Sequence, residues 1–204
     1  TAPSRDALLD SLRQYFDQGG FQADLARRVA CRTESDTGAP GPALEAYLRG
    51  EISPGLQALG FTCEVLPNPD PRGGPMLVAR RVEDPALPTL LTYGHGDVVS
   101  GQEGRWRAGL DPWTLKVEGE RWYGRGTADN KGQHSINLAA LAQVLAVRQA
   151  AGQGRRAPGS GFAQVSVLPS PDLGAFDSGE GGMVGRGADG ILRIGKEGLP
   201  FAAA

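Results

Sequence analysis

Hydrophobic residues recur every three or four positions in four segments of the first 150 residues, which is the pattern of helices with one buried face. These segments are 4–18, 21–30, 42–59 and 131–150. Ser4 is placed to cap the first helix, and Gly19-Gly20 ends it. Pro54 interrupts the third segment, so we expect a kink or a division there.

Extended segments separate the third and fourth helices. Residues 61–66 and 76–82 have strand character and are joined by a turn-rich stretch. The apolar run TLLTY, residues 89–93, is typical of a strand covered on both faces. Residues 113–118 and 121–123 flank Gly119 as a hairpin. Helices before and after strands predict an α/β fold, with a layered mixed sheet flanked by helices.

The pattern changes after residue 150. Thirteen of the 31 glycines lie in residues 151–204, where hydrophobic periodicity fades and only 162–168 and 191–194 have strand character. We therefore predict a domain over residues 1–150 and a separate Gly-rich tail over 151–204. Two hypotheses account for this tail: translation out of frame, or divergence to a fold of its own.

Composition narrows the class of protein. Hydrophobic residues make up 40% of the chain and charged residues 22%, with a net charge of −2, as in ordinary soluble domains. Neither a basic run for nucleic acid nor an apolar stretch of bilayer length is present. The start lacks the pattern of a secretory signal, which favours the cytoplasm. Cys31 and Cys63 have no CxxC spacing and are expected to be free thiols.

The first candidate for chemistry is Gly94-His95-Gly96-Asp97, directly after the apolar strand. Side chains two apart on an extended chain project to the same side, so His95 and Asp97 can meet. A carboxylate bonded to one imidazole nitrogen aims the other nitrogen at a metal ion. The competing interpretation is a structural histidine satisfied by a neighbouring acid.

The second candidate is Asp129, in the Gly-rich segment 124–132 at the mouth of the fourth helix. A carboxylate there can bridge two cations, and the helix amino terminus favours anionic groups of a substrate. The competing interpretation is a helix cap.

Taken together, these segments resemble the M20 family of metallopeptidases, which includes aminoacylases, dipeptidases, carboxypeptidases, succinyl-diaminopimelate desuccinylases and acetylornithine deacetylases. The resemblance lies in LLTYGHGDVV at 90–99, in Trp106 with Asp-Pro-Trp at 111–113, and in YGRGTADNKG at 123–132. It covers residues 1–150 and implies a zinc-peptidase-like catalytic domain, here incomplete. The full-length family member is expected to form a homodimer.

The resemblance also implies a two-zinc site, with Co²⁺ or Mn²⁺ as alternative ions. His95 would be a terminal ligand of one ion, Asp97 the catalytic carboxylate that orients it, and Asp129 the bridge between both ions. A metal-activated water would then hydrolyse a peptide or N-acyl amide bond. Small peptides and N-acyl amino acids are the expected substrates, and neither a nucleic acid nor a membrane is an expected partner.

The chain departs from the family pattern downstream. Family members carry a Glu-Glu pair that supplies the general base and a metal ligand, whereas no such pair occurs here. His134 does not match a family ligand and is expected on a helix face or behind the ligands, and Glu180 in the tail is rejected as a substitute base. We expect this chain to bind at most one zinc weakly and to be inactive. The alternative is a non-catalytic metal- or partner-binding fragment on the same scaffold.

Overall fold

The computed structural model describes residues 4–35, 41–68, 73–83, 86 and 90–152, together with three later strands. The helices are α1 (Arg5–Asp17), α2 (Gly20–Ala30), α3 (Gly41–Tyr47), α4 (Ser53–Ala58) and α5 (Lys131–Ala150). The strands are β1 (Thr62–Leu66), β2 (Met76–Arg80), β3 (Leu91–Gly94), β4 (Lys116–Glu118), β5 (Arg121–Tyr123), β6 (Gln164–Val167), β7 (Gly182–Arg186) and β8 (Leu192–Lys196). A π-helical turn spans Leu48–Ile52, and a 3-10 turn spans Glu103–Arg105.

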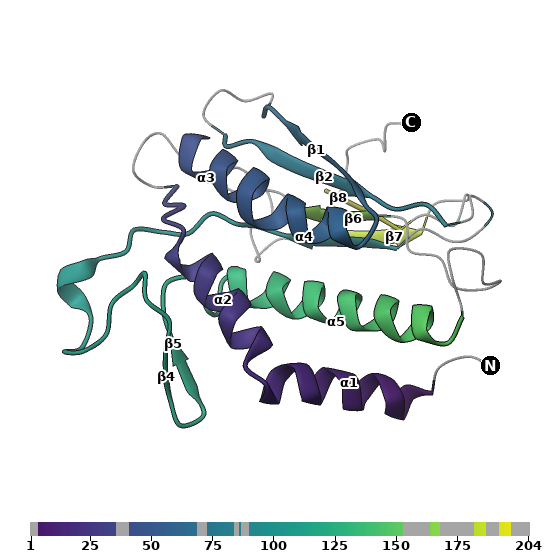
Figure 1. The fold of residues 1–204 in the computed structure, drawn as a ribbon. Coiled ribbons are helices and arrows are strands. Elements are labelled where there is room, and N and C mark those ends of the chain that lie inside the picture. The colour runs from purple at the N-terminus through teal and green to yellow at the C-terminus, as the bar shows by residue number, and fades with distance from the viewer. Residues whose placement is uncertain are drawn as a thin grey trace.

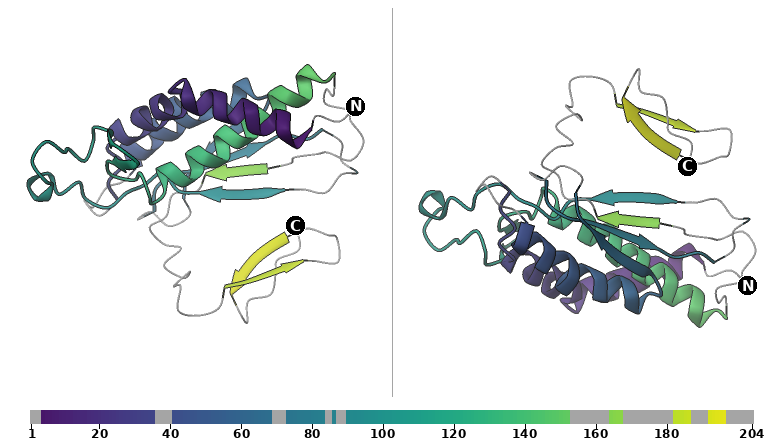
Figure 2. Two further views of the ribbon diagram at one scale, coloured as in Figure 1. Left: turned by 90° about the horizontal axis from the view of Figure 1, so that it is seen from below. Right: turned by 90° about the horizontal axis from the view of Figure 1, so that it is seen from above.

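Four strands form the main sheet in the order β1-β2-β6-β3 (Figure 1). β2 is antiparallel to both β1 and β6, whereas β3 and β6 run parallel. α5 provides the crossover between β3 and β6, as parallel neighbours require. The described helices lie on one side of this sheet (Figure 2). The fold is therefore a mixed, layered α/β arrangement, as the pattern of elements predicts.

The predicted helices are confirmed, with one change in the third. The Ser4 hydroxyl accepts a hydrogen bond from the Ala7 amide at 3.1 Å and caps α1. Segment 42–59 is divided into α3, the π-helical turn and α4. Pro54 lies in the first turn of α4, where a missing N–H group leaves no hydrogen bond unmade. The division predicted at this proline is thus present.

Strand β3 differs from its prediction as a strand covered on both faces. Leu91 is 38% exposed and Tyr93 is 40% exposed, whereas Gly94 is buried. Successive side chains of a strand point to opposite faces, and the described helices cover one face of the sheet. The apolar composition of residues 89–93 therefore predicted a strand correctly, but the prediction that both of its faces are buried was wrong.

The hydrophobic core lies between the sheet and the helices. Its centre is the buried face of the α3–α4 segment, which packs on β2 and on the second half of α5. The buried members are Leu44, Tyr47, Leu48, Ile52, Leu56, Phe61, Leu77, Ala79 and Leu145. This core fixes α5 against the sheet and so positions the loop that precedes it.

One strand of the sheet comes from beyond the predicted boundary at residue 150. β6 lies between β2 and β3, and β7 pairs with β8 in a separate two-stranded sheet. Most of residues 151–204, including Glu180, lies outside the described part of the chain. The assignment of this segment as a separate tail stays a prediction.

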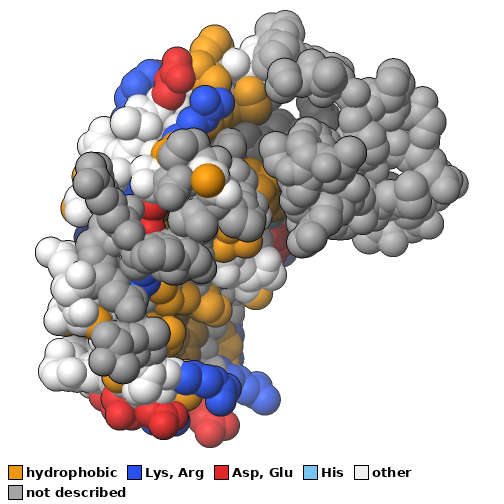
Figure 3. Space-filling view, turned by 90° about the vertical axis from the view of Figure 1, so that its right-hand side faces the viewer, with side chains coloured by type: hydrophobic (Ala, Val, Ile, Leu, Met, Phe, Trp, Pro, Cys, Tyr) orange, Lys and Arg blue, Asp and Glu red, His pale blue; other side chains and the backbone are white. Residues whose placement is uncertain are grey.

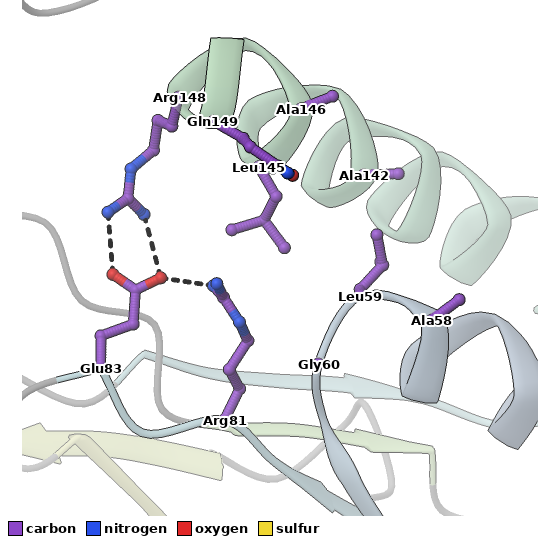
Figure 4. Close-up of a pocket in the computed structure, with 10 residues that line it drawn as sticks. All are labelled: Ala58, Leu59, Gly60, Arg81, Glu83, Ala142, Leu145, Ala146, Arg148 and Gln149. Carbon is purple, nitrogen blue, oxygen red and sulfur yellow. Dashed lines mark hydrogen bonds and ion pairs between the residues drawn. The ribbon is translucent and has the colours of Figure 1, made fainter. Parts of the chain in front are cut away.

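The end of the molecule near the carboxyl terminus of α5 holds a buried ion-pair cluster. A pocket of about 400 Å³ lies there, between Gly60, Leu145 and Arg148. The Glu83 carboxylate contacts the guanidinium groups of both Arg81 and Arg148, the latter at 2.8 Å (Figure 4). Hydrophobic side chains are visible between charged ones at this end (Figure 3). The cluster lies at the opposite end of α5 from the residues singled out for chemistry.

None of the described helices combines the length and the apolar character needed to cross a bilayer. Cys31 and Cys63 are free thiols, and each is partly buried.

Candidate metal centre

The carboxyl end of β3 and the amino terminus of α5 bring the predicted site residues together. His95 follows the last residue of β3, and Asp129 lies two residues before α5. A side chain at Gly94 would bring its Cβ to 2.6 Å from the Cβ of His134 on α5. Glycine therefore allows the end of the strand to approach the first turns of the helix closely. Ligand sites of α/β sheets commonly lie at this edge.

Both imidazole nitrogens of His95 face carboxylates. Nδ1 lies 3.0 Å from Oδ1 of Asp97, and Nε2 lies 3.0 Å from Oδ1 of Asp129. The Asp97 side chain is 9% exposed and the Asp129 side chain 81% exposed. The two acids therefore have different surroundings: Asp97 holds the ring from the interior, while Asp129 meets it at the surface.

These neighbours change the acidity of His95. Partial burial by itself would lower the pKa of the imidazole, because burial penalises the charged form. Hydrogen bonds and negative charge from Asp97, and then from Asp129, outweigh burial and raise the pKa above its usual value. The site thus has negative potential, which attracts cations.

The ligand atoms at this site, an imidazole nitrogen and a carboxylate oxygen, are of the types that bind zinc. Imidazole nitrogen and carboxylate oxygen bind zinc at about 2.1 Å, so two tetrahedral ligands lie about 3.4 Å apart. Nε2 of His95 and Oδ1 of Asp129 are 3.0 Å apart. If these two atoms moved apart by a further few tenths of an ångström, an ion could bind between them.

The donor set is small. A catalytic zinc usually has three protein ligands. In the part of the chain that the structure describes, no group of three or more His, Cys, Asp or Glu side chains could hold a metal ion. His95 and Asp129 therefore provide two direct ligands, and Asp97 orients one of them.

The loop after α2 holds the segment 95–98 in place. The Val98 amide donates to the Thr33 carbonyl at 2.9 Å, and the Thr33 hydroxyl donates to the Gly96 carbonyl at 2.5 Å. Glu34 accepts a hydrogen bond from the Gly101 amide at 2.8 Å. Sequence reasoning missed these residues, because a polar loop carries no local signal of its distant partner.

Lys131 anchors the other side of the site. Its side chain is fully buried, and its ammonium group donates to the backbone carbonyls of Arg28 and Cys31 at 2.9 and 2.5 Å. These carbonyls end α2, where a positive charge is favourable. The ammonium also lies 5.1 Å from the centre of the Tyr47 ring. Burial lowers the pKa of Lys131 to about 8.

The second histidine, His134, lies in the core behind the site. It is 3% exposed, and its Nε2 is hydrogen-bonded to the Tyr47 hydroxyl at 2.6 Å. Burial lowers its pKa to about 3, and the positive charges of Arg28, Lys131 and His95 add to this effect. His134 is therefore a neutral core residue in this geometry, consistent with its expected position behind the ligands.

We predict that the neutrality of His134 makes stability depend on pH. A histidine titrates near pH 6.5 in the unfolded chain, so between pH 6.5 and 3 the unfolded state binds the extra proton. Stability is therefore lost as the pH falls below 6.5, by roughly 3 kcal/mol at pH 4.5. Urea denaturation of wild type and His134→Gln at pH 7.5 and 4.5 measures this. A variant that loses as much stability as wild type would refute the prediction.

The tryptophans of the predicted motif belong to the loop beside the site. Trp113 is 6% exposed and donates from Nε1 to Glu103 at 2.9 Å, and the Trp106 indole donates to the Gly101 carbonyl at 2.7 Å. The guanidinium of Arg125 lies 5.6 Å from the Trp106 ring. The two hydrogen bonds brace segment 101–113 internally, and the Arg125 contact ties this segment to the loop that leads to Asp129.

Residues 91–152, which carry both candidate ligands, match the model of peptidase family M20/M25/M40. Together with the relatives below, this match supports the assignment of the chain as a fragment of an M20 family metallopeptidase. The matching family is one of enzymes, and it implies use of divalent metal ions.

Particular relatives support this assignment. The chain is 39% identical over 89 residues to acetylornithine deacetylase of Proteus mirabilis, covering 44% of this chain and 22% of the relative. It is 31% identical over 163 residues to Beta-Ala-His dipeptidase of Mus musculus, covering 72% and 32%. The crystal structure of human carnosine dipeptidase 1 matches with a TM-score of 0.64 and 24% identity, over 83% of this chain and 36% of that one. The chain spans at most about a third of the curated relatives it matches.

Proposed function

We propose that this chain carries the metal-binding edge of a hydrolase that cleaves peptide or N-acyl amide bonds in small substrates. The observation that carries the proposal is the convergence of His95, Asp97 and Asp129 at the carboxyl end of β3. Deacetylases and dipeptidases among the relatives favour this class of substrate. The whole protein is proposed to bind two zinc ions, with Co²⁺ or Mn²⁺ as alternatives, and to form a homodimer.

Each of the three residues has a separate task in this proposal. Asp97 accepts the Nδ1 proton of His95 and thereby turns Nε2 toward the ion. His95 would hold an ion through Nε2, and the exposed carboxylate of Asp129 would be the other residue that holds metal at this edge. Ions held there would acidify a water molecule and polarise the carbonyl of the scissile bond.

We also propose that the 204-residue chain by itself is inactive. General base catalysis contributes about 10²–10⁴-fold to such reactions. The Glu-Glu pair that would supply the base is absent from the sequence, and two direct ligands hold an ion weakly. We therefore expect at most one zinc ion per chain and no turnover.

Zinc titration by calorimetry, together with hydrolysis assays on N-acetyl amino acids and dipeptides, tests this function. We expect one weak zinc site and no hydrolysis by the chain. Two tightly bound ions with measurable turnover would show that a base and further ligands are present after all. Absence of any zinc binding would refute the metal-binding role.

A second candidate is a non-catalytic fragment that binds a metal or a partner on the same scaffold. The absence of the Glu-Glu pair and the small number of metal-binding side chains favour this second candidate. One weak zinc site without turnover fits both candidates for the chain, so their distinction requires the hydrolysis assay on a protein of the relatives' length.

A further inference from the structure

We propose that Asn130 is a positioning residue that clamps the backbone of His95 to the loop carrying Asp129. The inference rests on the proposed function, because the clamp serves the pair of metal ligands. It adds to that function a residue that binds neither ion nor substrate and fixes the distance between the two ligands.

The clamp is a direct hydrogen bond between the two ligand-bearing segments. The backbone amide of His95 donates to Oδ1 of Asn130 at 3.1 Å. Asn130 is 8% exposed, so water competes little for this bond. Because Asn130 is the neighbour of Asp129, the bond joins the first residue after β3 to the loop before α5.

The amide of Asn130 is held from its other side as well. Its Nδ2 donates to Oε1 of Gln133 at 2.5 Å, one helical turn further along the chain. An amide has both an acceptor and a donor, and this arrangement uses one of each. Nδ2 thus faces Gln133, while Oδ1 faces the His95 amide.

Close packing makes the clamp specific. A Cβ at Gly94 would lie 3.2 Å from Oδ1 of Asn130 and closer still to the Cβ of His134. The end of β3 therefore rests on α5 with little free space. A small change at Asn130 shifts the backbone of His95 against Asp129 while leaving the core beneath α5 in place.

Three variants of the full chain test the inference: Asn130→Ala, Asn130→Asp and Gln133→Ala. Alanine removes the acceptor. Aspartate keeps an oxygen for the His95 amide and also introduces a charge beside Asp129. Gln133→Ala leaves the Oδ1 bond intact. Zinc affinity is measured by titration with zinc chloride. Hydrogen exchange of the His95 amide is measured by NMR without metal. The Tm of each variant is measured as a check on folding.

We expect Asn130→Ala to weaken zinc binding about 10–100-fold, as loss of an orienting partner does. Exchange of the His95 amide should become about tenfold faster. Asn130→Asp should restore slow exchange and zinc affinity, and Gln133→Ala should change either quantity less than threefold. A purely structural role would lower the Tm of Asn130→Ala without selective exposure of the His95 amide.

Two results would overturn the clamp: unchanged His95 exchange in Asn130→Ala, or equally fast exchange in Asn130→Asp and Asn130→Ala. Failure of the wild-type chain to bind zinc would refute the proposed function instead. In that case the His95 exchange rates of the variants still decide the inference.

Discussion

Replacement of His95 by alanine is expected to weaken zinc binding at least about 100-fold. The change removes one of two direct ligands, and the exposed Asp129 carboxylate alone holds an ion poorly. Asp97→Asn should have a smaller effect, about 10–100-fold, because it perturbs the orientation of the ring and leaves the ligand in place. Calorimetric titration of the three proteins with zinc chloride measures this order.

The other histidine of the chain provides the matched control. His134→Gln removes a core imidazole that is hydrogen-bonded to Tyr47 and is not one of the proposed ligands, so it should change zinc affinity less than threefold. Equal losses in His95→Ala and His134→Gln would mean that zinc binds nonspecifically to imidazoles. Unchanged binding in His95→Ala would place the metal elsewhere and contradict the proposed centre.

Replacement of Glu83 by glutamine is expected to cause the largest loss of stability, about 3–5 kcal/mol. The Glu83 side chain is 2% exposed, and its partners Arg81 and Arg148 are 10% and 7% exposed. Without the carboxylate charge, the two positively charged guanidinium groups remain close together, buried from water and without a negative charge to balance them. Urea denaturation followed by circular dichroism at pH 7.5 gives the change in unfolding free energy.

Glu64→Gln serves as the control for this effect. Glu64 is exposed on β1, so its replacement should change stability by no more than about 0.5 kcal/mol. If Glu83→Gln lost less than 1 kcal/mol, the cluster would be hydrated enough to tolerate the unbalanced charge. The stability assigned to this end of α5 would then be wrong.

Local sequence patterns were sufficient for most helices and for the ligand-bearing segments. The spacing of apolar residues predicts α1, α2 and α5 because one buried face repeats every three or four residues. The His95-x-Asp97 spacing predicts a contact that follows from the geometry of an extended chain, and the structure has it at 3.0 Å. The helical pattern that begins at residue 131 places Asp129 at the mouth of α5.

Local sequence patterns could not predict which faces of β3 are buried, or which residues hold the site in place. The same apolar run fits a strand covered on one face or on two, and only the position of the helices decides between them. Asn130, Lys131 and Thr33 are ordinary polar residues in the sequence. Their roles depend on partners 35, 103 and 63 positions away, respectively.

The sequence by itself thus determined most of the elements in residues 1–150 and predicted the two candidate ligands, because these depend on neighbours within a few residues. The tertiary structure decided the insertion of β6 between β2 and β3, the neutral state of His134, and the clamp on His95. Each of these depends on burial and on contacts between distant segments, which come into existence only when the chain has folded.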